Sequence, residues 1–333
     1  MSSTKQILAM LRSRAAGDEE RFFSIALQVA AAEARQGHRE VAEELRAEVD
    51  KARSKEARGA SVAIPFATPR GSLEGLLELR QPRFKLKDVV LNEGLLARTN
   101  DILRQQRKRD WLHEHGKAPN RRILFVGPPG SGKTMSAEAL AGELHLPMYV
   151  IRLDSMITRY MGETAAKLRL IFDETAKRRA VYLFDEFDAV GGHRTATNDV
   201  AEMRRVLNSF LQFMEEDNAT DSVIICSTNH PKLLDRALLR RYDQVLEFEE
   251  PTPEQVRKLI GANLGAMKIS KPNWKKIVEM AAGLSQSEIV RAIDDAIKTA
   301  ILDERNHLTT GNLLERLTER HSMRNAFSES KGP

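Results

Sequence analysis

Residues 127–134 read Gly127-Pro128-Pro129-Gly130-Ser131-Gly132-Lys133-Thr134, and this stretch decides the fold of the chain. It matches the pattern G-x-x-x-x-G-K-[ST], with an expected strand at 122–126 before it and a helical pattern over 133–144 after it. Glycines let consecutive backbone N–H groups turn toward an anion, and a helix N-terminus adds positive partial charge. Lys133 would place its charge on the β- and γ-phosphates of a nucleotide, and the Thr134 hydroxyl would hold Mg²⁺.

Two adjacent carboxylates, Asp185 and Glu186, follow the apolar run at 181–184. Ligands bind at the carboxyl ends of strands in open parallel sheets. We expect Asp185 to hold Mg²⁺ through water, and Glu186, which points elsewhere, to orient and deprotonate the attacking water. A strand that simply ends in an acidic turn is the alternative, and the position 52 residues after Lys133 disfavours it.

A third polar group, Ser227-Thr228-Asn229, follows the apolar run at 223–226. An amide at a strand end beside the phosphate loop could hold the attacking water or the γ-phosphate. A turn explains the same three residues equally well, since asparagine is common in turns.

The order of strands and helices predicts an α/β fold. Short apolar runs lie at 123–126, 148–151, 181–184, 223–226 and 245–248, with helical patterns between them. This arrangement is typical of a buried parallel sheet, here of five strands, flanked by helices. We expect the following regions: an N-terminal helical hairpin (1–58), a linker (59–83), the α/β domain (84–249), a small all-helical domain (250–322) and a flexible tail (323–333).

Composition excludes several classes of protein. The chain has 333 residues, of which 41% are apolar, 30% charged and 5% aromatic, so it suits a folded, helix-rich α/β protein. No apolar run approaches the length of a membrane helix, the N-terminus lacks a signal peptide pattern, and the single cysteine, Cys226, is expected in a buried strand. We therefore expect a cytoplasmic protein with no membrane partner. Basic residues cluster over 104–122, which a solvated helix and loop or an anionic partner would explain.

The motifs occur in an order that resembles the AAA+ ATPases, and specifically the classical AAA clade of protein remodelers. The phosphate loop, the acidic pair and the Ser-Thr-Asn turn are followed by Leu234-Asp235-Arg236-Ala237-Leu238-Leu239-Arg240-Arg241-Tyr242-Asp243. The resemblance covers about 84–320 and implies ATP and Mg²⁺ as cofactors and ATP hydrolysis as the reaction. It also implies that Asn229 is the sensor 1 residue.

The resemblance implies further site residues. Arg240 and Arg241 would be arginine fingers that reach the γ-phosphate bound to a neighbouring subunit, where a guanidinium suits the charge of phosphoryl transfer. The family commonly has Pro-Gly between these arginines, which are adjacent here, so either could be the finger. The backbone of Asp88-Val89-Val90 would hold adenine.

A segment of the C-terminal region, Gly283-Leu284-Ser285-Gln286-Ser287-Glu288, is similar to the family's Gly-x-Ser-Gly-Ala-Asp. By this resemblance Gly283 and Ser287 would lie near the adenosine. Gln286 and Ser287 stand where the family has smaller residues. Arg291 follows at an offset that does not match a sensor arginine.

The resemblance also implies what the free energy of ATP hydrolysis is used for. Tyr160, Met161 and Gly162 resemble pore loop 1, which would grip an extended polypeptide, and 191–199 would form the second pore loop. The implied assembly is a ring of identical subunits, six by family expectation, that unfolds, threads or remodels protein. Region 1–58 would bind substrates or partners. Compact AAA proteins of this kind resemble bacterial ATPases paired with a separately encoded, subtilisin-like serine protease.

Two alternatives remain at this stage. The first is a nucleic-acid-directed ATPase that assists transposition or replication, which the basic cluster over 104–122 favours and the aromatic pore loop disfavours. The second is a nucleotide-switched scaffold that hydrolyses little. Glu186→Gln would leave such a scaffold unaffected, whereas it would stop a motor.

Overall fold

The computed structural model describes residues 73–153, 163–187, 197–216, 218–230 and 239–329, together with residues 26, 29–30, 38 and 41–43. By internal contacts the chain divides into two units, 1–66 and 67–333. Three predicted features lie wholly or largely outside the described residues: the helical hairpin (1–58), the pore-loop residues Tyr160, Met161 and Gly162, and the glycine-rich part of the second pore loop (191–196).

Six strands form one sheet in the order β1-β3-β4-β5-β2-β6. The strands are β1 (Leu77–Arg80), β2 (Arg122–Val126), β3 (Met148–Ile151), β4 (Val181–Phe184), β5 (Val223–Thr228) and β6 (Gln244–Glu247). The last five run parallel to their neighbours, which confirms the prediction from the apolar runs. β1 instead pairs antiparallel with β3. The sheet is therefore mixed, and the predicted linker at 59–83 is wrong where it includes this strand.

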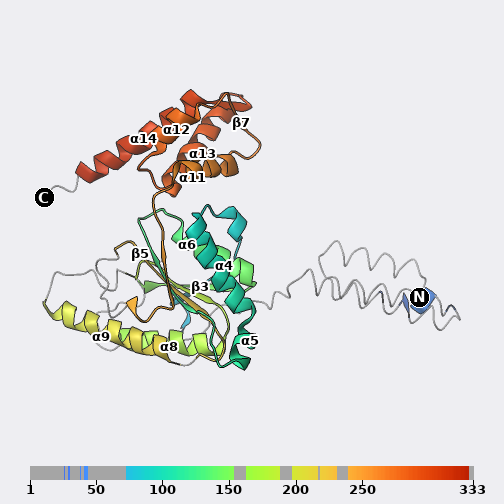
Figure 1. The fold of residues 1–333 in the computed structure, drawn as a ribbon, viewed down its shortest axis with the longest axis vertical. Helices are drawn as coiled ribbons and strands as arrows, with labels where there is room; N and C mark the ends of the chain where they lie inside the picture. Colours follow the sequence, from blue (N-terminus) through green and yellow to red (C-terminus); the bar gives the residue numbers. More distant parts are fainter. Residues whose placement is uncertain are drawn as a thin grey trace. The chain divides into compact units, whose positions relative to one another are not determined.

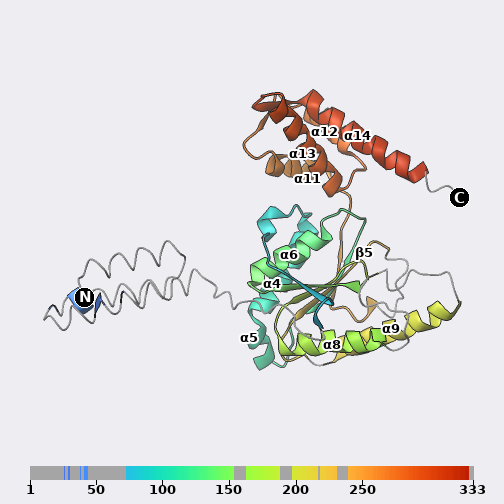
Figure 2. The ribbon, with the colours of Figure 1, turned by 180° about the vertical axis from the view of Figure 1, so that it is seen from behind.

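Helices cover both faces of the sheet (Figures 1 and 2). Helices α4 (Glu93–Arg107) and α6 (Lys133–Leu144) pack on one face, and α8 (Glu163–Lys177) and α9 (Thr197–Glu215) pack on the other. Successive side chains of a strand point to opposite faces of the sheet. Ile123 and Phe125 of β2 therefore belong to the core under α4 and α6, and Leu124 belongs to the core under α8 and α9. A short helix, α5 (Arg109–Glu114), precedes β2. In this arrangement β2, β4 and β5 end at one edge of the sheet.

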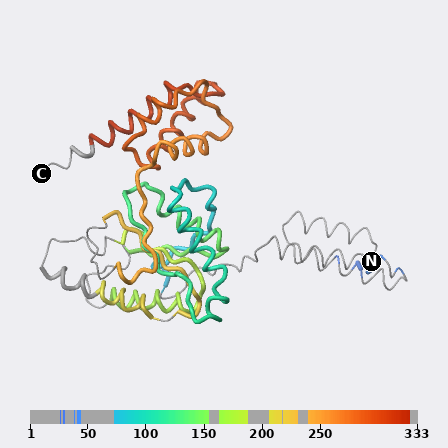
Figure 3. Tube along the Cα trace, viewed as in Figure 1, coloured from blue at the N-terminus to red at the C-terminus, as the bar shows by residue number. Residues whose placement is uncertain are grey.

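The C-terminal region is a helical unit with its own apolar core. Its elements are α11 (Pro253–Asn263), β7 (Lys268–Ser270), α12 (Trp274–Ala281), α13 (Gln286–Leu302), β8 (His307–Thr309) and α14 (Thr310–Glu329), which Figure 3 follows as a trace. The expectation of an all-helical region is wrong in one respect, because β7 and β8 pair in parallel. The expected tail is also wrong over 323–329, which continue α14.

No helix in the described part of the chain is long and apolar enough to span a membrane. The longest of them, α14, has 20 residues and carries charged side chains such as Arg316 and Glu319 along its length.

Candidate nucleotide-binding site

The phosphate loop lies between β2 and α6, and close packing explains its glycines. A Cβ on Gly127 would collide with the carbonyl oxygen of Phe248, which follows β6. Gly130 has φ +74°, and a Cβ there would collide with the Ser287 hydroxyl. Gly132 caps α6 with φ +94°, in the left-handed region that glycine tolerates. Larger residues at these places would displace the loop from its supports.

Lys133, the first residue of α6, is 7% exposed and forms hydrogen bonds inside the site. Its Nζ donates to the carbonyl oxygens of Gly127 and Pro128 and to Oδ1 of Asn229, each at 2.8 Å. Asn229 follows β5, the neighbour of β2 in the sheet. The sheet therefore brings together two predicted site residues that lie 96 positions apart.

Hydroxyl groups hold both carboxylate oxygens of Asp185. Thr134 Oγ1 donates to Oδ2 at 2.8 Å, and the Ser227 hydroxyl donates to Oδ1. The Ser227 oxygen also accepts the backbone N–H of Glu186 at 3.3 Å. Ser227 itself is buried, at 1% exposure, so its hydroxyl is held within the protein. The carboxylate of Asp185 thus has a defined orientation at the end of β4.

Glu186 adopts a left-handed backbone conformation, with φ 51°. That conformation costs a non-glycine residue roughly 1 kcal/mol, and such strain is concentrated at functional sites. The turn breaks the strand geometry directly after Asp185, and both acidic residues line the same cavity. The sequence expectation that the two carboxylates serve different positions in one site is consistent with this arrangement.

A cavity of about 550 Å³ joins these groups to the C-terminal region. One part of its lining is polar and consists of the phosphate loop with Lys133, Thr134, Asp185, Glu186 and Asn229. The rest of the lining is mainly apolar but includes polar and charged side chains. It comprises Phe84, Asp88, Val90, Met135, Leu259, Ala262, Asn263, Gln286, Ser287, Val290 and Arg291. A triphosphate with a flat base matches such a division in size and polarity.

The N-terminus of α13 meets the phosphate loop directly. The backbone N–H of Ser287 donates to the Gly130 carbonyl at 3.0 Å. Ser285 caps α13 by accepting the N–H of Glu288, whose carboxylate bonds back to the Ser285 N–H at 2.7 Å. This reciprocal cap fixes the start of the helix. The segment that contains the predicted residues Gly283 and Ser287 is therefore held against the loop.

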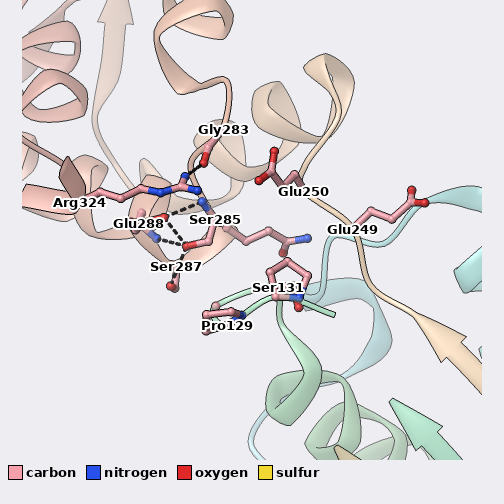
Figure 4. Close-up of a pocket in the computed structure, with 12 residues that line it drawn as sticks. Pro129, Ser131, Glu249, Glu250, Gly283, Ser285, Ser287, Glu288 and Arg324 are labelled. Carbon is pink, nitrogen blue, oxygen red and sulfur yellow. Dashed lines mark hydrogen bonds between the residues drawn. The ribbon is translucent and has the colours of Figure 1, made fainter. Parts of the chain in front are cut away.

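A second, smaller cavity of about 360 Å³ lies beside the first and is shown in Figure 4. Pro128, Ser131 and Gly283 line it rather than the larger cavity, and Pro129, Gly130 and Ser287 line both. Arg324 of α14 reaches the Gly283 carbonyl in this view. The Ser131 hydroxyl is buried and has no hydrogen-bond partner among the described residues.

Two predicted adenine-binding residues differ in their placement. Asp88 lines the larger cavity, and its carboxylate accepts the Lys85 N–H at 2.8 Å. Val89 is buried at 8% exposure and does not line the cavity, whereas its neighbour Val90 does. This segment therefore borders the larger cavity through Asp88 and Val90.

The arginine segment is anchored just before β6. Arg241 forms an ion pair with Glu215 at the end of α9. Arg240 is exposed and forms no ion pair within the described part of the chain. Asp243 holds the segment to β2, since its Oδ2 accepts the N–H groups of Arg121 and Arg122 at 3.0 and 2.9 Å. Neither arginine lines the larger cavity.

The Asp243 carboxylate also accepts hydrogen bonds from the Arg122 guanidinium at 3.1 and 2.6 Å. Burial acts to raise the pKa of Asp243, but the bonds from Arg122 and from two backbone N–H groups outweigh it and lower the pKa below its ordinary value. Cys226 is buried, as predicted, and burial raises the pKa of its thiol to about 12. This thiol is unsuited to nucleophilic chemistry.

Four further residues border the site without having been assigned a role from the sequence. Ser227 belongs to the Ser-Thr-Asn group discussed above, and its position directly after the apolar run at 223–226 could have indicated that it lies near the site. Asn263, Gln286 and Arg291 line the larger cavity from α11 and α13. Arg291 does so despite its unmatched offset. The sequence does not reveal these three residues, because only the packing of the C-terminal region brings them to the site.

The residues present fit a magnesium nucleotide. The Lys133 ammonium is surrounded by acceptors that phosphate oxygens could replace, and the glycines of the loop add no side chains of their own to it. Mg²⁺ binds through one or two protein oxygens, waters and substrate phosphates. Thr134 and Asp185 are the oxygen ligands that the site offers.

Fold and site together define a P-loop nucleoside triphosphatase. Residues 123–250 match the ATPase family associated with various cellular activities (AAA). The chain is 30% identical over 292 residues to an uncharacterized AAA family ATPase, y4kL, of Sinorhizobium fredii, with 88% of each chain covered. The chain belongs to the AAA ATPase family, and it is an ATP hydrolase.

Two other relatives carry more specific names. A proteasome-activating nucleotidase of Saccharolobus islandicus is 30% identical over 295 residues, which cover 82% of this chain and 74% of that protein. An ATP-dependent zinc metalloprotease FtsH of Helicobacter pylori is 29% identical over 247 residues, or 71% of this chain. The match spans only 38% of that metalloprotease.

Proposed function

We propose that the protein is a ring-forming AAA ATPase that couples ATP hydrolysis to the unfolding, threading or remodelling of other proteins. The observation that carries the ATPase site is the convergence of Lys133, Thr134, Asp185, Glu186 and Asn229 on one cavity of about 550 Å³. The relatives named for proteolysis and proteasome activation support protein as the substrate class.

Each residue of the site has a chemical role in this proposal. Lys133 exchanges its present acceptors for the β- and γ-phosphate oxygens, and Asn229, already within 2.8 Å of that lysine, helps to position the γ-phosphate and the water. Thr134 and Asp185 hold Mg²⁺, which neutralises phosphate charge when bound. Glu186 accepts a proton from the attacking water. The phosphate loop and Ser287 keep these groups in register.

The stabilising arginine comes from the next subunit. Arg240 is exposed and Arg241 is paired with Glu215, so Arg240 is the more available guanidinium and Arg241 is the one that supports the segment. A ring in which Arg240 enters the neighbouring site would explain why neither arginine lines its own cavity. Six subunits is the stoichiometry expected for the family.

A complementation experiment tests this arrangement. One variant carries Arg240→Ala and Arg241→Ala and keeps its own phosphate site; the other carries Glu186→Gln and keeps its arginines. Each alone should hydrolyse ATP at a few per cent of the wild-type rate or less, and mixed rings should recover activity, because intact sites meet intact arginines. Full activity of the double arginine variant as a monomer would contradict the proposal.

Protein as the substrate is tested at Tyr160, which lies outside the described residues. Tyr160→Ala should leave ATP hydrolysis near the wild-type rate and abolish unfolding of a tagged, fluorescent test protein. Loss of both activities, or of neither, would argue against a threading role. Region 1–58 is proposed to recruit substrates or a separately encoded serine protease, and pull-down with the isolated partner is the direct measurement.

A nucleic-acid substrate is less favoured by the structure of the basic cluster. Four of its arginines form ion pairs within the chain, namely Arg104, Arg107, Arg109 and Arg122. Paired guanidiniums offer less charge to phosphates, and nucleic-acid binding depends on that charge. ATP hydrolysis stimulated by DNA and suppressed by salt would restore this alternative.

A further inference from the structure

Arg324, near the end of α14, lines the smaller cavity from the C-terminal region (Figure 4). Among the described residues of this lining it is the only basic one, and Glu249, Glu250 and Glu288 are the acidic ones. Glu249 and Glu250 lie on the connection between β6 and α11. The cavity is therefore acidic apart from this guanidinium, and acidic surroundings favour the position of a cation there.

The guanidinium binds the backbone of the segment that joins α12 to α13. Arg324 Nη1 donates to the Gly283 carbonyl, which has no other donor among the described residues. Gly283 has φ +79°, a left-handed conformation that glycine adopts without strain. A hydrogen bond from a charged donor is stronger than one between neutral groups. The bond from Arg324 therefore fixes the path by which the backbone enters α13.

That segment supports the phosphate loop. Ser285, two residues after Gly283, caps α13, and the N–H of Ser287 donates to the Gly130 carbonyl at 3.0 Å. The packing is close, because a Cβ built on Gly130 would collide with the hydroxyl oxygens of Ser285 and Ser287. Close packing transmits displacements. A shift of the Gly283 carbonyl would therefore move the N-terminus of α13 against the loop that receives the phosphates.

We propose that Arg324 is a positioning residue for ATP binding, which holds the Gly283 carbonyl and thereby keeps the N-terminus of α13 seated on the phosphate loop. The inference rests on the proposed nucleotide site and extends it to α14, a helix that contributes no residue to the larger cavity. Loss of the guanidinium should weaken ATP binding and spare the chemical step, because the hydrogen bond between Lys133 and Asn229 lies wholly within the α/β region.

Arg324→Met tests this inference, because it removes the charge and the donors and keeps a long, unbranched side chain. The dissociation constant of ATP, measured by calorimetry with Mg²⁺ on the full chain, should rise about five-fold, since one hydrogen bond contributes a net free energy of this order. A phosphate-release assay should show KM rising by a similar factor, with kcat at saturating ATP unchanged within about two-fold. Arg324→Lys keeps a charged donor and should restore most of the affinity.

Arg320→Met is the matched control, one helical turn earlier on α14. Arg320 forms an ion pair with Asp295 of α13 and lines neither cavity. Its loss should lower the melting temperature, because α13 and α14 are then held together less firmly, and should leave the dissociation constant of ATP unchanged. Arg324→Met should show the opposite pattern, with weaker ATP binding and a melting temperature close to that of the wild type without nucleotide.

Equal weakening of ATP binding in Arg320→Met and Arg324→Met would overturn the inference, because a general loosening of α14 would explain both. An unchanged dissociation constant in Arg324→Met would also overturn it and would leave the proposed function standing. If wild-type protein binds no ATP, the proposed function itself fails.

Discussion

Two parts of the larger cavity are built in different ways: the phosphate end, formed by the phosphate loop with Lys133, Thr134, Asp185 and Asn229, and the part lined by Val90, Leu259, Gln286 and Val290, which we call the base end because the proposed nucleotide would place its base there. At the phosphate end, side chains from one loop and two strand ends are already joined by hydrogen bonds, as between Lys133 and Asn229 and between Thr134 and Asp185. At the base end, two distant segments meet, and Gln286 contacts Val90 through a single side-chain hydrogen bond of 3.1 Å. The first end is an arrangement of charges, and the second is an arrangement of packed surfaces.

This difference teaches which features of the site follow from chemistry and which follow from packing. Phosphate groups demand donors, a cation and a metal ligand at set places, so the residue types at that end are narrowly constrained. A base demands mainly a flat apolar space, which many residue combinations can supply. The chain keeps the family's pattern at the phosphate end and departs from it at Gln286 and Ser287.

The largest effect is expected at Glu186. Glu186→Gln should lower kcat for ATP hydrolysis by about 10²- to 10⁴-fold, because the amide cannot accept the proton of the attacking water. ATP binding should be retained, and a phosphate-release assay with parallel calorimetry separates the two. Glu315→Gln, an exposed change on α14, is the control. Wild-type turnover in Glu186→Gln would indicate a different base.

A smaller effect is expected from Lys133. Lys133→Ala removes a charged donor to the phosphates and should raise the dissociation constant of ATP by roughly 10²-fold, since hydrogen bonds to charged groups are the strong ones. The exposed Lys298 of α13 supplies a matched loss of charge in Lys298→Ala, which should leave binding unchanged. Equal weakening in both variants would mean that net charge alone, rather than the phosphate end, controls affinity.

Ser227 should have a more moderate influence, as a positioning residue. Ser227→Ala removes the hydroxyl that bonds Asp185 and the Glu186 N–H. We expect kcat to fall about ten-fold, with a higher Mg²⁺ concentration needed for half-maximal rate and little change in nucleotide affinity. Ser322→Ala, which removes a hydroxyl from α14, is the control. An unchanged magnesium requirement would show that Ser227 only supports the fold.

Asp243 lies away from both ends and should alter stability instead of binding. Its folded-state pKa is lowered, so it contributes stability that is present above the ordinary pKa of aspartate, about 4, and is lost as the pH falls through the lowered value. Asp243→Asn should cost roughly 1–2 kcal/mol of unfolding free energy at pH 7. The difference from wild type should shrink as the pH falls below the ordinary pKa of aspartate and through the lowered value.

Chemical denaturation at several pH values measures the effect. The exposed Asp173, which pairs with Arg169, provides the control variant Asp173→Asn. It should show a much smaller loss at pH 7, because exposed ion pairs contribute little. A stability difference for Asp243→Asn that persists unchanged at pH 3 would contradict the ionic explanation.

Much of the fold was predictable because it depends on local patterns. Five parallel strands follow from short apolar runs separated by helical segments, and β2 to β6 occur at these runs and pair in parallel. β1 was missed because Leu77–Arg80 mixes charged and apolar residues, as an edge strand does. β7 and β8 were missed because three-residue strands leave almost no periodic signal.

The amino-acid sequence by itself determined the chemistry of the phosphate end, since glycines, a lysine, a threonine and two carboxylates at fixed spacing suffice to specify a phosphate loop and its metal ligands. Only the tertiary structure decided the base end, where Val90 and Gln286 meet across 196 residues. The physical reason is the distance along the chain over which the interactions act. Backbone conformation and strand order act locally along the chain, whereas the shape of an apolar pocket depends on how distant surfaces pack.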